Sequence, residues 1–254
     1  MSTEKQNPFS KEVTANLEAL RKNPYPGRGI IMGLNISGEH AVQVYWVMGR
    51  SDNSRNRLLV REEEAVKTIP FDASKVKDPS LIIYNAIRVI GDKHVVSNGD
   101  QTDTVVETIQ KGGSFEDALL TRTFEPDKPN NTSRISGMIA LKPLRFNLSR
   151  IAVDQESPGA KEDPTPRHDF FSPVKGLEVR NGIGVCVHTY KGDGNPLPTF
   201  YDEPYPVPLV GKIDDIANLY WDVLSNENKV AMVVKTIDLS TGQTDFRIKN
   251  KLSK

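Results

Sequence analysis

Three arginines and two serines follow directly on an apolar segment in the first quarter of the chain. The stretch Y-W-V-M-G-R-S-D-N-S-R-N-R, residues 45–57, contains Arg50, Ser51, Ser54, Arg55 and Arg57. Guanidinium groups form rigid forks that match phosphate oxygens, and serine hydroxyls can donate to the acceptors that remain. The stretch therefore indicates an anion site at the end of a strand, with a solvated loop and surface ion pairs as the alternative.

A second candidate is the stretch Y-N-A-I-R-V, residues 84–89. Alternation along a strand places Tyr84 and Arg88 on one face, from which both side chains could reach a single pocket. A core tyrosine beside an arginine that extends its stem towards solvent would give the same pattern.

A third candidate, S-N-G-D-Q-T-D at residues 97–103, reads as a strand, a tight turn and the start of a helix. Thr102 or Asp103 is expected to cap that helix. The free N–H groups of a first helical turn favour an anion or a polar ligand, which makes Asn98 and Asp100 candidates for ligand contact. The alternative is a capped turn without a ligand, in which Asp100 or Thr102 only caps the helix.

The fourth candidate is F-E-P-D-K-P-N-N-T-S-R-I-S-G, residues 124–137. Glu125 supplies a carboxylate just before a turn limited by prolines. Thr132, Arg134 and Ser136 alternate along the strand that follows, so they are expected to share one face. A strand that faces solvent would show the same alternation.

Several catalytic patterns do not occur in the sequence. There is no H-E-x-x-H, C-x-x-C, G-x-S-x-G or P-loop, and no G-x-G-x-x-G opens a helix. The four histidines show no ligand spacing, and Cys186 in G-I-G-V-C-V reads as a buried, inert thiol. We therefore expect neither a metal site nor Ser-His-Asp machinery, and no cofactor.

The charge balance limits the partners of the chain. Its 254 residues contain 33 basic and 33 acidic side chains, so no overall field draws it to nucleic acid or to an anionic membrane. The polar start M-S-T-E-K-Q-N-P-F-S lacks the apolar centre of a signal peptide, and no apolar run reaches the roughly 20 residues that span a bilayer. A cytoplasmic protein is expected.

The hydrophobic pattern predicts many strands and few helices. Strands are expected at 28–35, 41–49, 58–60, 81–90, 94–98, 134–141, 144–153, 182–190 and 231–238, and helices at 9–22, 102–111, 115–123 and 212–224. This pattern is typical of α+β proteins in which helices cover antiparallel sheet. Residues 154–181, rich in proline and charge, are expected to form a long irregular loop within one domain.

Taken in order, the motifs resemble those of one family. The series P-G-R-G-I-I-M-G, M-G-R-S-D-N-S-R-N-R, Y-N-A-I-R-V, S-N-G-D-Q-T-D, F-E-P-D with T-S-R-I-S-G, and T-Y-K-G with L-P-T-F-Y-D-E-P is similar to archaeal-type inosine monophosphate (IMP) cyclohydrolases and their bacterial relatives. The likeness begins near Tyr25 and covers most of the chain. Each motif is modest alone, and the order makes the likeness specific.

The resemblance implies a fold and a reaction. The fold is a four-layer α-β-β-α sandwich like that of N-terminal nucleophile hydrolases, without their processed nucleophile. Residues 1–24 would be a helical extension and residues 25–254 a single domain. The reaction is ring closure of 5-formamidoimidazole-4-carboxamide ribonucleotide to IMP with loss of water, a step of purine synthesis that needs no metal or cofactor.

The resemblance also suggests roles for the candidate residues. Glu125 would be the base, Tyr84 the acid or oxyanion donor, and Arg50 with Arg55 the cations near the phosphate or the reacting oxygen. The residues expected to contact the purine ribonucleotide substrate are Arg28, Ser51, Arg55, Arg57, Arg88, Asn98, Asp100, Thr132, Arg134 and Ser136. Among the three arginines after the first apolar segment, Arg50 is the expected catalytic group because it lies nearest the strand end.

Two other functions fit the same motifs. One is an amide or formyl hydrolase that acts on a nucleotide-like substrate, and the other is a purine nucleotide-binding protein without turnover. The sequence does not give the oligomeric state, and a homo-oligomer is compatible with it.

Overall fold

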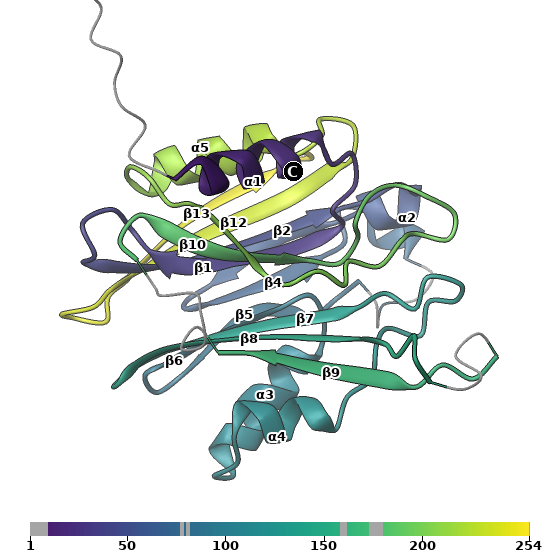
Figure 1. Cartoon of the computed structure of the whole chain (residues 1–254), viewed down its shortest axis with the longest axis horizontal. Helices are drawn as coiled ribbons and strands as arrows, with labels where there is room; N and C mark the ends of the chain where they lie inside the picture. The colour runs from purple at the N-terminus through teal and green to yellow at the C-terminus, as the bar shows by residue number, and fades with distance from the viewer. Residues whose placement is uncertain (1–9, 77–78, 80–81, 158–161, 173–179, 254) are drawn as a thin grey trace, which may run out of the picture.

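Two antiparallel sheets lie face to face at the centre of the protein (Figure 1). The computed structural model describes residues 10–76, 79, 82–157, 162–172 and 180–253. Buried side chains from both sheets form one apolar cluster between them. The α+β class with antiparallel sheet, expected from the hydrophobic pattern, is confirmed.

The first sheet has six strands, and a hairpin of β1 and β2 forms its middle. In spatial order the strands are β11 (Tyr205–Pro208), β10 (Ile183–His188), β1 (Arg28–Leu34), β2 (His40–Met48), β12 (Lys229–Asp238) and β13 (Thr244–Asn250). Pairing sets Tyr45 of β2 between Ile30 of β1 and Val233 of β12. The sheet therefore joins an early hairpin to strands from the last third of the chain.

The second sheet is a meander in which sequence neighbours are also spatial neighbours. Its strands are β3 (Leu58–Glu62), β4 (Ala65–Ile69), β5 (Asn85–Ile90), β6 (Lys93–Ser97), β7 (Arg134–Leu141), β8 (Leu144–Val153) and β9 (Pro166–Phe171). Between β6 and β7 the chain forms α3 and α4, and between β4 and β5 it forms a 3₁₀ turn. Each strand pairs antiparallel with the next.

Helices cover the outer faces of both sheets (Figure 1). The helices are α1 (Lys11–Lys22), α2 (Asp52–Arg55), α3 (Gln101–Gln110), α4 (Phe115–Leu120) and α5 (Ile213–Val223), with a 3₁₀ turn η1 (Ala73–Lys75). α1 and α5 pack on the six-stranded sheet, and α3 and α4 pack on the seven-stranded sheet. No helix in the described part of the chain is long and apolar enough to cross a membrane.

The central strands are apolar on both faces because each face meets another layer. In β1, Ile30 and Met32 point into the cluster between the sheets, whereas Ile31 packs under α1 and α5. In β2, Tyr45 points between the sheets and Trp46 points towards the helices. This two-sided burial explains the continuous apolar runs in the sequence.

The first helix forms as the sequence predicts, and α3 is capped differently. The Ser10 side chain accepts a hydrogen bond from the N–H of Val13, which confirms it as the N-cap of α1. The N-cap position of α3 is Asp100, as in the capped-turn alternative, and not Thr102 or Asp103. Thr102 instead lies inside the first turn and donates its hydroxyl to the carbonyl of Gly99.

Two irregular segments of the sequence prediction contain regular structure. The stretch after Gly49 was expected to continue as a loop, and it forms α2 with Ser51 as N-cap and a reciprocal bond from Ser54. The expected loop at 154–181 contains β9, which extends the second sheet by pairing with β8. Residues 158–161 and 173–179 of that loop lie outside the described residues.

Gly29 offers a direct test of the packing between the first sheet and its helices. A Cβ at Gly29 would lie 1.9 Å from Cζ2 of Trp46, whose ring is fully buried. We expect Gly29→Ala to lower the free energy of unfolding by about 1–3 kcal/mol, because Trp46 would have to leave its position. Urea denaturation of the purified variant measures this loss.

The matched control is Gly192→Ala. A Cβ at Gly192 meets nothing within 4 Å, so this variant should keep the unfolding midpoint of the parent protein. Equal midpoints for Gly29→Ala and the parent would contradict the packing described for Trp46.

Candidate active site

Two arginines and one glutamate, all nearly inaccessible to solvent, meet at one end of the space between the sheets. Arg28 is 8% exposed, Arg57 4% and Glu125 5%. Each of the three changes the pKa of another through its charge, which places them within electrostatic range. Buried charges of this kind are costly unless they are paired or bind a ligand.

Arg28 is fixed at the start of β1 by the residue before it. Gly27 has a φ of +75°, a conformation that other residues rarely adopt, and a Cβ there would lie 2.2 Å from Oγ1 of Thr189. The Arg28 N–H then donates to the same Thr189 hydroxyl at 3.1 Å. Arg28 shares the strand face of Ile30, so its side chain enters the space between the sheets.

Arg57 reaches the cluster because the chain turns between α2 and β3. The Asn56 side chain donates to the Asp72 carbonyl at 2.8 Å and accepts from the Asp72 N–H at 2.7 Å. This pair of bonds closes the turn against the segment that follows β4. Arg57 is thereby buried, while Arg55, two residues earlier, remains at the surface.

Glu125 sits in a closed loop that leads into β7. Its N–H donates to the Thr132 carbonyl at 2.8 Å, and the Thr132 N–H donates to Asp127 at 2.6 Å. Asn98 donates its amide N–H to the Ser133 carbonyl at 2.9 Å and lies 3.4 Å from Oε1 of Glu125. The loop and the turn after β6 thus hold the carboxylate in place.

Tyrosine hydroxyls complete the cluster. The hydroxyls of Tyr84 and Tyr45 lie 2.6 Å apart between the sheets, and the Tyr84 N–H donates to Oγ1 of Thr68 at 3.1 Å. Tyr190 forms a hydrogen bond with the Thr132 hydroxyl on the Glu125 loop. Three aromatic hydroxyls from separate parts of the chain are therefore set by bonds to protein groups.

Several polar atoms of the cluster make no hydrogen bond to any residue that the structure describes. They are Nε of Arg28, Nε and Nη1 of Arg57, Nε of Arg134 and Oγ of Ser133. A buried polar atom left without a partner costs about 1–3 kcal/mol, and more when the group is charged. The arrangement is suited to an anionic or polar ligand that accepts hydrogen bonds from these donors.

The pKa shifts follow from burial opposed by charge. Burial raises the pKa of Glu125 above its ordinary value of 4.5, although the positive charges of Arg28 and Arg134 act against this shift. Burial is the largest influence on Arg28 and acts to lower its pKa, but Glu125, Tyr25, Tyr84 and Tyr190 together outweigh it, so that pKa is raised. Burial, with the charge of Arg28, lowers the pKa of Arg57. Burial and the Tyr84 hydroxyl raise the pKa of Tyr45 well above its ordinary value.

Arg50, the predicted catalytic arginine, does not join the cluster. Its side chain is 36% exposed, pairs with Asp193 and donates to the Gly194 carbonyl at 2.8 Å. Its guanidinium also lies 5.2 Å from the ring centre of Tyr25. The residue next to a strand end was expected to point inwards, but α2 begins here and the chain turns Arg50 towards the surface.

Arg88 lies on the opposite face of the second sheet from Tyr84. Arg88 and Asn85 both donate to Asp103 of α3, whereas Tyr84 lies between the sheets. The pairing of β4 with β5 contains one extra residue in β5. The prediction that Tyr84 and Arg88 share a face is wrong because this bulge interrupts the alternation.

Arg134 and Ser136 share a face, as predicted, and that face lies under α3. Arg134 donates to Asp100 at 2.8 Å and to Gln101 at 2.7 Å, at the start of the helix. Ser136 accepts a hydrogen bond from Ser97. Arg134 still acts on the pKa of Glu125, whereas Asp100 is occupied by Arg134 and Arg122.

Two residues of the first arginine stretch have structural roles at the surface. Ser51 caps α2, and Arg55 donates to the Gly49 carbonyl at 3.0 Å and to Asn228 at 3.2 Å. Neither influences the pKa of Glu125. Of the three arginines in this stretch, only Arg57 is brought to the cluster, which also contains Tyr45 from the start of the stretch.

Four residues of the site were not among the sequence candidates: Tyr45, Tyr190, Ser133 and Asp127. Tyr45 and Tyr190 lie in apolar runs that read as ordinary core strands. Ser133 lies between two candidate positions of an alternating strand, and its opposite orientation followed from the same alternation. The motif that contains Asp127 was recognised, but its role in closing the loop was not.

The remaining titratable groups offer little chemistry. Burial raises the pKa of Cys186 to about 12, which agrees with an inert thiol. Within the described ranges, no group of three or more His, Cys, Asp or Glu side chains is placed to hold a metal ion.

Comparison with known proteins adds an independent observation. A family model described as IMP cyclohydrolase-like protein matches residues 25–243. The IMP cyclohydrolase of Methanosphaera stadtmanae is 37% identical over 176 residues, which are 63% of this chain and 84% of that relative. Those of Methanopyrus kandleri and Methanococcus maripaludis are 33% and 34% identical over 52% and 45% of this chain.

The chain spans 65% and 58% of the lengths of the last two relatives. The range that the family model matches contains Arg28, Arg57, Tyr84, Glu125 and Tyr190, and so the whole buried cluster. The chain belongs to the family of IMP cyclohydrolase-like proteins.

Proposed function

We propose that this chain is an IMP cyclohydrolase, which closes the ring of 5-formamidoimidazole-4-carboxamide ribonucleotide to IMP with loss of water. The observation that carries the proposal is the buried carboxylate of Glu125 beside the unpaired guanidinium nitrogens of Arg28 and Arg57. Family membership supports the same reaction. The substrate supplies both the negative charge and the acidic N–H that this arrangement is suited to bind.

The first step is attack of the carboxamide nitrogen on the formyl carbon. A new C–N bond forms, the C=O bond of the formyl group becomes single, and a proton leaves the nitrogen. Glu125 accepts that proton, and its raised pKa makes it a stronger base than an exposed carboxylate. Nitrogen and carbon belong to one molecule, so holding them in a reactive conformer supplies much of the rate.

The second step is loss of the former formyl oxygen as water. Tyr84 donates a hydrogen bond or proton to this oxygen, while Tyr45, 2.6 Å away, donates to Tyr84 in turn. The oxygen takes up two protons, the one that Glu125 accepted in the first step and the one that leaves the neighbouring ring nitrogen. The C–O bond then breaks with release of water, and a C=N bond forms. Tyr45 is suited to this supporting role because its raised pKa keeps it protonated.

The arginines offset the negative charge of the substrate and of the transition state. Arg28 and Arg57 take the role first expected of Arg50 and Arg55, because they lie within electrostatic range of both Glu125 and Tyr84. Their unpaired nitrogens are donors for the developing oxyanion and for the 5′-phosphate. Asn98, Thr132 and the other groups around the Glu125 loop position the carboxylate.

The proposal extends to the setting of the reaction. It includes a four-layer α-β-β-α arrangement resembling N-terminal nucleophile hydrolases, one domain over residues 25–254 after an extension at 1–24, and a cytoplasmic location. The two stacked sheets with helices outside them support the layered arrangement.

Replacement of the base is the first test. We expect Glu125→Gln to lower kcat/KM for ring closure by about 10²–10⁴-fold, because the amide cannot accept the proton. The absorbance of the hypoxanthine ring follows the product, and chromatography distinguishes it from the free amine that deformylation would give. Glu107→Gln, an exposed carboxylate on α3, is the control. A Glu125→Gln rate within a few-fold of the parent would exclude this role.

The two tyrosines should differ in their effects. We expect Tyr84→Phe to lower kcat by about 10²-fold, as when a single oxyanion donor is removed. Tyr45→Phe should lower kcat by a smaller factor, because it only weakens Tyr84 as a hydrogen-bond donor. Steady-state rates of both variants test this order, and a larger loss in Tyr45→Phe would reverse the assignment.

The pH profile tests the charge environment of Glu125. Because its pKa is raised, kcat/KM should fall on the acid side at a pH above 4.5. Arg28 lowers this pKa, so Arg28→Gln should move the acid limb to higher pH. The control is Arg50→Gln, which should leave the limb in place because Arg50 pairs with Asp193 at the surface.

If the Arg28→Gln variant is too slow to assay, a ¹³C NMR titration of the Glu125 carboxyl gives the pKa of Glu125 directly. An unchanged pKa in Arg28→Gln, or an equal shift in both variants, would contradict the placement of Arg28 beside Glu125.

A further inference from the structure

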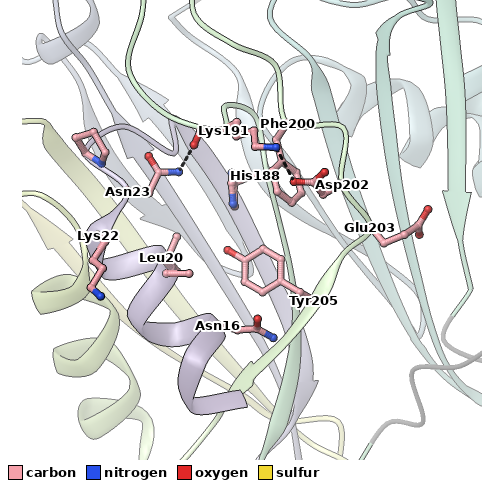
Figure 2. Close-up of a pocket in the computed structure, with 12 residues that line it drawn as sticks. Asn16, Leu20, Lys22, Asn23, His188, Lys191, Phe200, Asp202, Glu203 and Tyr205 are labelled. Carbon is pink, nitrogen blue, oxygen red and sulfur yellow. Dashed lines mark hydrogen bonds and ion pairs between the residues drawn. The ribbon is translucent and has the colours of Figure 1, made fainter. Parts of the chain in front are cut away.

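A second cavity lies on the opposite side of the first sheet from the Glu125 cluster. It has a volume of about 490 Å³ and lies between α1 and the end of β10 with the loop that leads to β11 (Figure 2). Its walls are mainly apolar and include Ala19, Leu20, Phe200 and Tyr205. Cavities of about 300–1,000 Å³ with mostly apolar walls and a few polar groups are the usual form of small-molecule sites.

One wall of this cavity lies outside the range that the family model matches. α1 covers residues 11–22, whereas the family model begins at residue 25. Ala19 and Leu20 of α1 line the cavity, and Asn16 of the same helix donates to the Pro206 carbonyl at 3.0 Å. The cavity therefore lies between α1 and the part of the chain that the family model matches.

His188 supplies a defined polar group in the cavity wall. Its side chain is 3% exposed, and Figure 2 shows it between Leu20, Phe200 and Tyr205. Nδ1 lies 3.0 Å from the Tyr190 carbonyl. A carbonyl only accepts hydrogen bonds, so Nδ1 carries the proton and Nε2 is an acceptor. Nε2 makes no hydrogen bond to another residue of the described ranges.

The imidazole stays neutral over the physiological range. Burial lowers the pKa of His188 to about 4, in spite of the hydrogen bond to the Tyr190 carbonyl. The groups of neighbouring elements that act on it are the Asp202 carboxylate, which opposes this shift, and Arg150, which adds to it. Lys22, Lys191 and Glu203 also line the cavity. A ligand here therefore meets a lone pair and not a positive charge.

Three rings that contact one another form one wall of the cavity. The Phe200 ring lies 4.1 Å from the His188 ring, centre to centre, and Tyr205 meets both rings nearly edge-on at 5.7 and 6.0 Å. Leu20 of α1 stands opposite them in Figure 2, and Ala19 of the same helix also lines the cavity. The space between an aromatic wall and an aliphatic wall suits a planar ring.

We propose that this cavity binds a neutral planar heteroaromatic ring that donates an N–H hydrogen bond to Nε2 of His188. Indoles and purine bases share this chemistry. The site is separate from the Glu125 cluster, and neither the proposed reaction nor the family match assigns it. Its ligand would contact the extension and the family domain at the same time.

The test compares two probes that differ at one atom. Indole carries the N–H donor, and 1-methylindole has nearly the same shape without it. We expect indole to bind about ten-fold more tightly, because the methylated probe would cover the Nε2 acceptor without giving it a hydrogen-bond partner. NMR of the ¹⁵N-labelled protein measures both affinities, and indole alone should shift the Nε2 resonance of His188 through a hydrogen bond.

A filled cavity provides the variant control. Ala19→Trp places a large ring in the cavity from an exposed helix position and should abolish indole binding. Glu18→Trp adds the same ring at the neighbouring exposed position of α1, which does not line the cavity, and should leave binding unchanged. Both variants should keep the ring-closure activity, so failure of the cavity proposal is distinguishable from failure of the proposed reaction.

A further titration distinguishes the two classes of ligand, indoles and purine bases. Hypoxanthine is titrated into the parent protein and into Ala19→Trp, so that binding at the Glu125 cluster is subtracted. Binding of indole or hypoxanthine in this cavity supports the proposal. The tighter binder of the two shows whether the natural ligand is an indole or a purine base. Equal affinity for indole and 1-methylindole, no binding of either, or indole binding that survives in Ala19→Trp would overturn it.

Discussion

The structure depends on one electrostatic constraint, a carboxylate and an excess of guanidinium groups enclosed between two sheets. Glu125 faces Arg28, Arg57 and Arg134, and the charges of all three act to lower its pKa while burial raises it. A cluster of this composition is stable only if neighbouring groups fix every position closely. Gly27, with its left-handed backbone conformation, and the closed loop that begins at Glu125 hold these groups in position.

The local features of the site could be read from the sequence because they depend on near neighbours. The Glu125 motif, the turn at Asn98 and the hairpin that begins at Arg28 were all recognised as short patterns. In the structure the Asn98 side chain accepts from the Ile135 N–H at 2.9 Å and donates to the Ser133 carbonyl, so the turn and the strand are joined as the motifs suggested. The antiparallel α+β class followed from the spacing of apolar residues in the same way.

The direction in which each side chain of a motif points could not be predicted from the sequence, because it depends on small departures from regular geometry. The four residues of α2 decide that Arg57 points inwards and Arg50 outwards. One extra residue in β5 decides that Arg88 leaves the face of Tyr84. Tyr45 was hidden for another reason, since a tyrosine in an apolar strand looks like core until its hydroxyl partner from the other sheet is known.

The enclosure of the cluster has a consequence for how a nucleotide reaches it. Dissolved ions screen exposed charges over about 8–10 Å but act much less on buried ones. The chain as a whole, with 33 basic and 33 acidic residues, creates no long-range field that would steer an anion. Under the proposed function, a nucleotide would arrive by unassisted diffusion and be attracted only once it has entered between the sheets. Ionic strength should change its capture far less than on an open basic surface.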